Sequence, residues 1–78
     1  MNIDNLEFDK FLKDLGKSIK DKRMSLTITQ QELAYRCDIE KSNIVRIETG
    51  RTNPTTKPLK IIAKSLNIKV KDLFDFED

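Results

Sequence analysis

Residues that interrupt regular structure are scarce in this chain of 78 residues. Only four occur, the glycines and prolines Gly16, Gly50, Pro54 and Pro58. Because glycine and proline most often break helices and strands, long segments can run without interruption. Alanine, leucine, lysine and glutamate favour helix, and no alternating apolar and polar run reaches a convincing strand length. The predicted fold class is therefore all-α.

The length predicts one domain, because 78 residues lie near the lower limit at which a core alone gives useful stability. Self-association would add to that stability. Charges interrupt every apolar stretch, so we expect no membrane span, and the N-terminus MNIDNLEFDK lacks the basic start of a secretory signal. We therefore expect a cytoplasmic protein.

The sequence shows no recognisable combination of catalytic residues. The chain has no histidine, one cysteine, Cys37, and no glycine-rich phosphate loop. A single thiol without histidine cannot form an internal disulfide or the usual zinc cluster, and general acid-base and nucleophilic catalysis lack components. We therefore predict neither an enzyme nor a protein with a metal or cofactor, and we interpret Cys37 as a buried packing residue.

Charge is distributed unevenly along the chain. Residues 15–70 hold twelve Lys or Arg against five Asp or Glu, a net charge of +7. The segments on either side, 1–14 and 71–78, carry −2 and −3. A basic body with acidic ends suits a polyanionic ligand, although a soluble protein can also carry such charges without binding anything.

Apolar spacing and capping residues predict the first two helices. Phe8, Phe11, Leu12, Leu15 and Ile19 recur at steps of three and four, which predicts a helix over about 6–24. A second helix should begin at Gln30. In a capping box, the Thr29 hydroxyl would accept from the backbone N–H of Glu32, and the Glu32 side chain would accept from the backbone N–H of Thr29.

The next two helices follow from similar signals. Asp38 stands where the chain must turn and tolerates a positive φ, so a third helix can begin at Lys41 and end before a left-handed cap at Gly50. Thr55 is expected to cap a fourth helix that ends near Asn67. A short last helix carries Val70, Leu73 and Phe74.

The third helix presents two different faces. On a helical wheel Ile44 and Ile47 share one side, while Ser42, Val45, Arg46 and Thr49 occupy the other. Two helices joined by a short turn, the second displaying small polar and basic groups, fit the major groove of DNA. An ordinary helical hairpin with a solvated outer face explains the two helices equally well.

Two longer segments resemble the lambda-repressor-like, or Xre-type, helix-turn-helix family of bacterial and phage regulators. They are TQQELAYRCDIEKSNIVRIETGRTNP and LKIIAKSLNIKVKDLF, and the resemblance runs from about Leu15 to Phe74. In size and style the chain is also similar to controller proteins of restriction-modification systems and to small phage repressors. The resemblance implies a five-helix DNA-binding domain over 1–78, with an N-terminal extension at 1–14, the helix-turn-helix at 29–50 and an acidic tail at 75–78.

The resemblance also implies roles for individual residues. The positions from which the family reads base edges match Lys41, Ser42, Asn43 and Arg46, and Val45 on the same face could contact a thymine methyl group. Residues matching phosphate contacts are Gln30, Arg51, Thr52 and Asn53. Arg23 and Glu48 match an interhelical ion pair, which we interpret as structural. For each DNA-contacting side chain the alternative is a merely solvated group.

Three residues depart from the family pattern. Asp38 and Thr27 stand where the family usually has glycine. Glu40 replaces a serine or threonine cap, and its carboxylate would favour the helix N-terminus but repel phosphate. Glu40 therefore works against a close approach of that helix end to DNA.

The resemblance implies a homodimeric regulator of transcription on double-stranded DNA with an inverted-repeat operator. Repression would exclude RNA polymerase and activation would contact it, and the sequence does not choose between them. The dimer surface is also open. One candidate surface lies in the last helices, at Ile68, Val70, Leu73, Phe74 and Phe76, and the other in the extension, at Phe8 and Phe11.

A second class of function is a protein-interaction module, such as an antitoxin whose DNA binding is secondary. The acidic segments at both ends could engage a basic protein partner. A partner that co-purifies with the chain would favour this function over operator binding.

Overall fold

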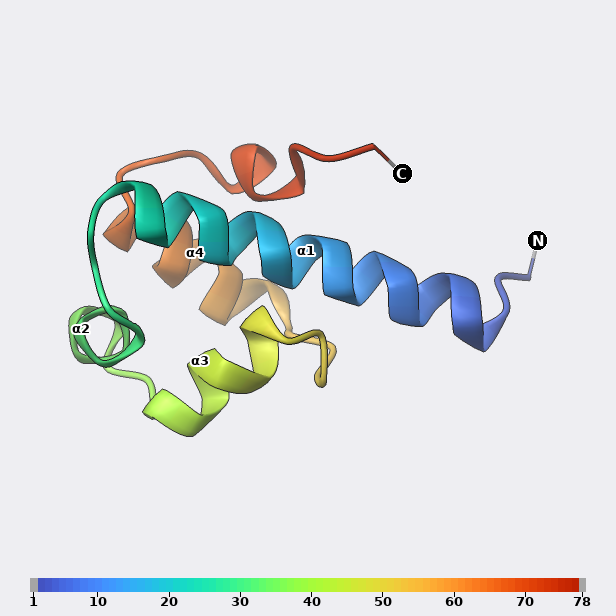
Figure 1. Ribbon diagram of the computed structural model, residues 1–78, viewed down its shortest axis with the longest axis horizontal. Helices are drawn as coiled ribbons and strands as arrows, with labels where there is room; N and C mark the ends of the chain where they lie inside the picture. Colours follow the sequence, from blue (N-terminus) through green and yellow to red (C-terminus); the bar gives the residue numbers. More distant parts are fainter. Residues whose placement is uncertain (1, 78) are drawn as a thin grey trace.

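The computed structural model describes residues 2–77 and consists of helices joined by short loops (Figure 1). The all-α class is confirmed, but the fifth predicted helix is a single short 3-10 helix. The helices are α1 (Asn5–Ser25), α2 (Gln30–Cys37), α3 (Lys41–Glu48), α4 (Thr56–Ser65) and the 3-10 helix η1 (Val70–Phe74).

Capping residues place the helix ends where the sequence indicated. Asp38, Gly50 and Asn67 follow α2, α3 and α4 with φ of 54°, 72° and 59°, so each reverses the chain in the left-handed region. At the start of α2 the Thr29 hydroxyl accepts from the Glu32 backbone N–H at 3.0 Å. These residues set the short connections that hold neighbouring helices together.

Two capping predictions need correction. The Glu32 carboxylate does not close the capping box; it accepts from Arg36 Nε at 3.0 Å, four residues along the same helix. Thr55 does precede α4, but its side chain makes no capping hydrogen bond. At Thr27 the chain adopts a positive φ of 57°, which fits the glycine usual there better than a β-branched residue.

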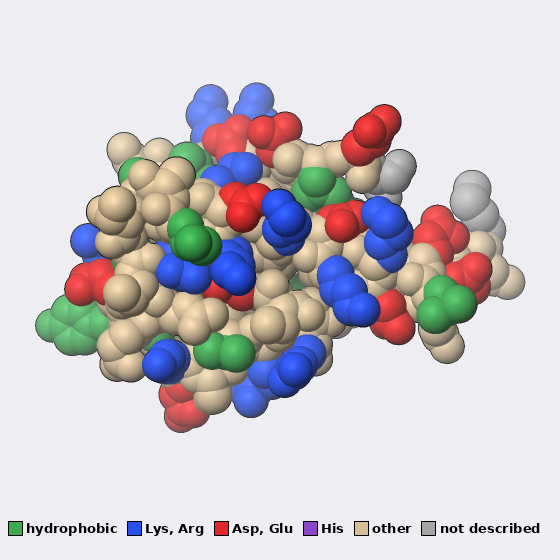
Figure 2. Space-filling view, viewed as in Figure 1, with side chains coloured by type: hydrophobic (Ala, Val, Ile, Leu, Met, Phe, Trp, Pro, Cys, Tyr) green, Lys and Arg blue, Asp and Glu red, His purple; other side chains and the backbone are tan. Residues whose placement is uncertain are grey.

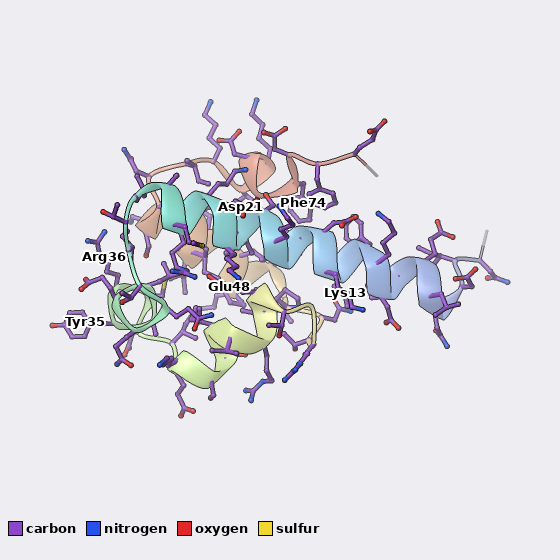
Figure 3. The ribbon with its side chains drawn as sticks, in the orientation of Figure 1. Lys13, Asp21, Tyr35, Arg36, Glu48 and Phe74 are labelled. Atoms are coloured by element: carbon purple, nitrogen blue, oxygen red, sulfur yellow. The ribbon has the colours of Figure 1, made fainter. Side chains whose placement is uncertain are left out.

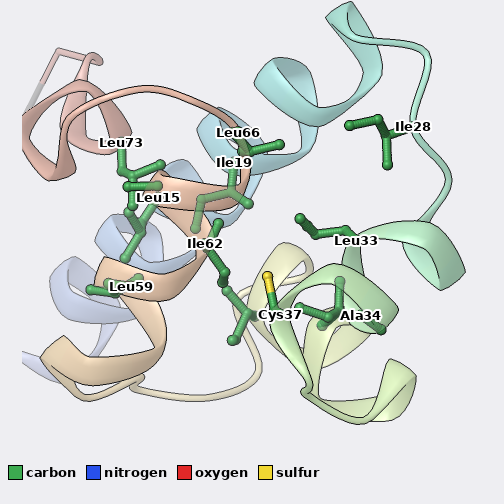
Figure 4. Packing of buried hydrophobic residues seen from close by; sticks show 13 residues of the cluster. Leu15, Ile19, Ile28, Leu33, Ala34, Cys37, Leu59, Ile62, Leu66 and Leu73 are labelled. Atoms are coloured by element: carbon green, nitrogen blue, oxygen red, sulfur yellow. The ribbon is translucent and has the colours of Figure 1, made fainter.

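One hydrophobic core joins all five elements. Leu15 and Ile19 of α1, Leu33 of α2 and Ile62 of α4 meet there, and η1 contributes Leu73, which is fully buried (Figure 4). Of the two dimer surfaces expected from sequence, the one in the last helices therefore loses Leu73, because that side chain closes the core of its own protomer.

Cys37 belongs to the same core. Its side chain is buried, and the thiol donates to Ser65 Oγ at 3.2 Å. Burial raises the pKa of the Cys37 thiol, and the hydrogen bond with Ser65 lowers it to a smaller extent. The thiol is therefore a packing group, as predicted, and not an activated nucleophile.

The N-terminal part of α1 extends past the other helices (Figure 1). Phe8 and Phe11 of this part form an aromatic cluster with Phe74 and Phe76. Phe11 lies at its centre, with its ring centroid 6.2 Å from that of Phe74 and 5.6 Å from that of Phe76.

Across residues 2–77, no helix has the length and apolar character needed to cross a membrane.

Helix α1 crosses the C-terminal end of α3 at Gly16, where the backbones are in close contact. A Cβ atom added to Gly16 would lie 2.3 Å from the Ile47 carbonyl oxygen and 2.6 Å from that of Glu48. Both obstacles are backbone atoms, so they cannot rotate away. The orientation of α3 on the body therefore depends on a glycine in the middle of α1.

We expect Gly16→Ala to lower the free energy of unfolding by about 1 to 2 kcal/mol. Overpacking costs roughly 1–3 kcal/mol, and two backbone carbonyls in the way put Gly16 in the upper part of that range, about 2–3 kcal/mol. The better helix propensity of alanine offsets up to about 1 kcal/mol of that cost. Urea unfolding followed by circular dichroism measures the change. An Ala variant as stable as the wild type, or more stable, would show that α1 and α3 are not in close contact at this position.

Candidate nucleic-acid interface

Helices α2 and α3 are joined by three residues and held at a fixed angle. Within the turn, the Ile39 backbone N–H donates to the Ala34 carbonyl at 3.0 Å. Ile44 and Ile47, only 1% and 3% exposed, then anchor one side of α3 in the core. The opposite side of α3 is left at the protein surface.

The surface side of α3 carries most of the residues predicted to read bases. Lys41, Ser42 and Arg46 are exposed, while Asn43 and Val45 are half-buried. The buried Ile44 and Ile47 hold the backbone of α3 against the core, so the Cα positions of these surface residues are fixed. Figure 2 shows Lys and Arg side chains over α3 and the adjoining part of α1.

Thr49 and Glu40 flank α3 at its two ends. Thr49 is exposed, but its hydroxyl donates to the Val45 carbonyl at 2.8 Å and so caps its own helix. Glu40 precedes the helix with an exposed side chain that makes no capping hydrogen bond. Its negative charge therefore remains next to the N-terminus of α3.

A buried ion pair fixes the opposite end of α3 to α1. Arg23 Nε lies 2.7 Å from Glu48 Oε2, and Arg23 Nη2 lies 3.0 Å from Glu48 Oε1, an arrangement with two parallel hydrogen bonds. Both side chains are nearly inaccessible, 8% exposed for Arg23 and 1% for Glu48. Figure 3 shows Glu48 between α1 and α3.

Two further groups complete this buried network. Arg23 Nη1 donates to the Ile28 carbonyl oxygen at 2.6 Å, and Gln30 Nε2 donates to Glu48 Oε1 at 3.0 Å. The network therefore joins α1, the loop before α2, the first residue of α2 and the last residue of α3. It holds the two helices of the motif in one orientation on α1.

Gln30 thus has a contact that sequence reasoning missed. The residue was expected at a DNA phosphate, but its half-buried amide is already oriented by Glu48. One N–H of the amide is still available to an outside acceptor. The partner lies 18 residues away in the chain, so no local pattern could have indicated it.

The loop after α3 lies against α1. Arg51 and Asn53 are exposed and Thr52 is half-buried, and the Arg51 backbone N–H donates to the Arg46 carbonyl at 2.9 Å. Gly50, at the start of this loop, packs directly on Lys13 of α1, which was not among the predicted site residues. The exposed surface of α3 is therefore continuous with the loop and with α1.

The sequence matches the family model described as helix-turn-helix over residues 19–73, which is more than two thirds of the chain. The chain belongs to the helix-turn-helix family. This family comprises DNA-binding regulators of transcription. Its model covers α2, the turn, α3 and α4, together with the buried ion pair.

Curated members of the helix-turn-helix family resemble this chain over most of its length. An uncharacterized HTH-type transcriptional regulator of Archaeoglobus fulgidus is 38% identical over 60 residues, which are 77% of this chain and 84% of the relative. The control protein C.BamHI of Bacillus amyloliquefaciens is 34% identical over 62 residues, 78% of this chain and 76% of the relative.

A solved structure with the same fold is the restriction-modification controller protein C.AhdI of Aeromonas hydrophila. It superimposes with a TM-score of 0.80 over 81% of this chain and 96% of its own, at 24% identity. At that identity the likeness shows the fold alone. It places the helices of this helix-turn-helix protein in the arrangement found in a controller protein.

Proposed function

We propose that this helix-turn-helix protein binds a specific double-stranded DNA site as a homodimer and regulates transcription there. The observation that carries the proposal is the construction of α3. Its apolar side is buried through Ile44 and Ile47, its far end is held by Glu48, and Ser42 and Arg46 remain exposed. A rigid helix with a free polar face is what reading a major groove requires.

Within this proposal Arg46 has the most specific role. Its guanidinium can donate to guanine O6 and N7 together, and its backbone is fixed by the buried residues on either side, Ile44 and Ile47. Lys41, Ser42 and Asn43 would reach base edges near the start of α3. The shorter Val45 would meet a thymine methyl group.

Phosphate contacts would surround this helix and set its register on the duplex. Gln30 would offer its remaining amide N–H from the start of α2. On the other side Arg51, Thr52 and Asn53 would donate from the loop after α3. Contacts of this kind position a protein without carrying sequence information, so they belong to specific and non-specific binding alike.

Two protomers related by a twofold axis would place their α3 helices in successive major grooves of an inverted repeat. The candidate surface near the last helices keeps Ile68 and Val70, which are half-buried beside an open groove between α4 and η1. The second candidate, in the N-terminal extension, keeps Phe8, whose ring stacks on that of Phe11 with centroids 6.1 Å apart. Similarity to C.BamHI favours a controller type of regulator, and contact with RNA polymerase would accompany activation.

Selection of bound sequences from random duplexes tests this function. We expect an enriched inverted repeat, bound with an affinity that falls steeply as salt rises. Sedimentation of the protein with and without the selected duplex measures the number of protomers. Failure to enrich any site would favour the protein-interaction module, and a single protomer on the DNA would contradict the dimer.

A further inference from the structure

Lys10, Lys13 and Lys17 follow one another at helical spacing on α1 and differ in their ionic partners. Lys10 Nζ lies 2.7 Å from Asp14 Oδ2, and Lys17 Nζ lies 2.8 Å from Asp21 Oδ2. Lys13 stands between them, is exposed, and has no acidic side chain within ion-pair distance among residues 2–77. Its positive charge is therefore not compensated locally as those of its neighbours are.

The position of Lys13 links it to the end of α3. A Cβ atom added to Gly50 would lie 2.7 Å from Lys13 Cγ and 2.8 Å from its backbone nitrogen, so the two residues are in direct contact. Gly50 also has a positive φ of 72°, which turns the chain here into the loop carrying Arg51. Figure 3 shows Lys13 on α1 beside this loop.

We propose that Lys13 binds a DNA phosphate and extends the DNA-binding surface from the α3 loop onto α1. The inference rests on the proposed function, because it adds a contact to the same surface. Lys13 lies outside the segment that matches the family model, residues 19–73, so the contact belongs to this chain's own extension. A lysine is suited to the role, since its ammonium is a flexible point charge that can follow a phosphate.

The fixed backbone makes this contact favourable. Lys13 packs against Gly50, which directly precedes Arg51 in the chain. DNA bound at the loop would therefore bring its phosphates near the Lys13 ammonium without a change in fold. Lys10 and Lys17 would first have to leave their aspartates. Neutralising one phosphate releases close to one counterion, so Lys13 should contribute about 0.9 to the slope of log affinity against log salt.

The test compares Lys13→Gln with Lys17→Gln, which changes net charge equally on the same helix. Binding of the selected duplex and of a scrambled duplex is measured over a series of salt concentrations. We expect Lys13→Gln to lower the slope by about 0.9 on both duplexes and to weaken binding roughly 8-fold at 0.1 M salt. Lys17→Gln should leave the slope unchanged, and thermal unfolding should be the same for both variants.

The outcomes separate this inference from the function on which it rests. If the wild type binds the selected duplex with steep salt dependence and Lys13→Gln keeps the full slope, the inference alone fails. Equal losses in both variants would also overturn it, because they would reflect net charge and not position. If the wild type binds no duplex, the proposed function itself fails.

Discussion

Glu48→Ala is expected to lower the free energy of unfolding by about 3–5 kcal/mol, the usual cost of removing one partner of a buried ion pair. Glu48 accepts three hydrogen bonds, two from Arg23 and one from Gln30, at distances of 2.7 to 3.0 Å. Without it, the buried Arg23 guanidinium keeps only the Ile28 carbonyl among these partners. Chemical unfolding of the purified variant measures the loss.

The exposed pair of Glu32 and Arg36 supplies a matched control. These side chains are about half exposed, so Glu32→Ala should cost less than about 1 kcal/mol although it also breaks a Glu–Arg pair. A double variant, Arg23→Met with Glu48→Leu, should be more stable than Glu48→Ala, since no charge is left buried. A Glu48→Ala protein as stable as the Glu32→Ala control would mean that the network contributes little.

Arg46→Ala should weaken binding to the selected duplex by about 5- to 150-fold, equivalent to the roughly 1–3 kcal/mol of a bidentate contact with guanine. Arg46 is exposed and makes no side-chain ion pair within residues 2–77, so its removal should leave unfolding almost unchanged. Repeating the selection with the variant should relax preference at one base position in each half-site. Affinity for scrambled DNA should change far less.

Arg51→Ala is the counterpart that separates base reading from phosphate binding. It should weaken binding to the selected and scrambled duplexes by the same factor, without altering the preferred sequence. It should also reduce the slope of log affinity against log salt by about one. If Arg46→Ala behaved in this same way, Arg46 would be a phosphate contact and specificity would have to come from Lys41, Ser42 or Asn43.

The sequence by itself determined where the helices lie and which sides of them face inward. These properties depend on residues a few positions apart, such as Thr29 with the Glu32 backbone or the three-residue step from Ile44 to Ile47. The left-handed backbone conformations of Asp38 and Gly50 were also predictable, because few residue types tolerate a positive φ. Resemblance to a known family then supplied the candidate DNA-contacting residues.

Only the tertiary structure decided how these segments meet. Gln30 joins a carboxylate 18 residues away, and Leu73 is buried in its own protomer. Contacts between distant segments depend on the angle and depth at which helices pack, and no local pattern records that geometry. The closeness of Lys13 to Gly50 is of this kind, since it follows from the crossing of α1 and α3.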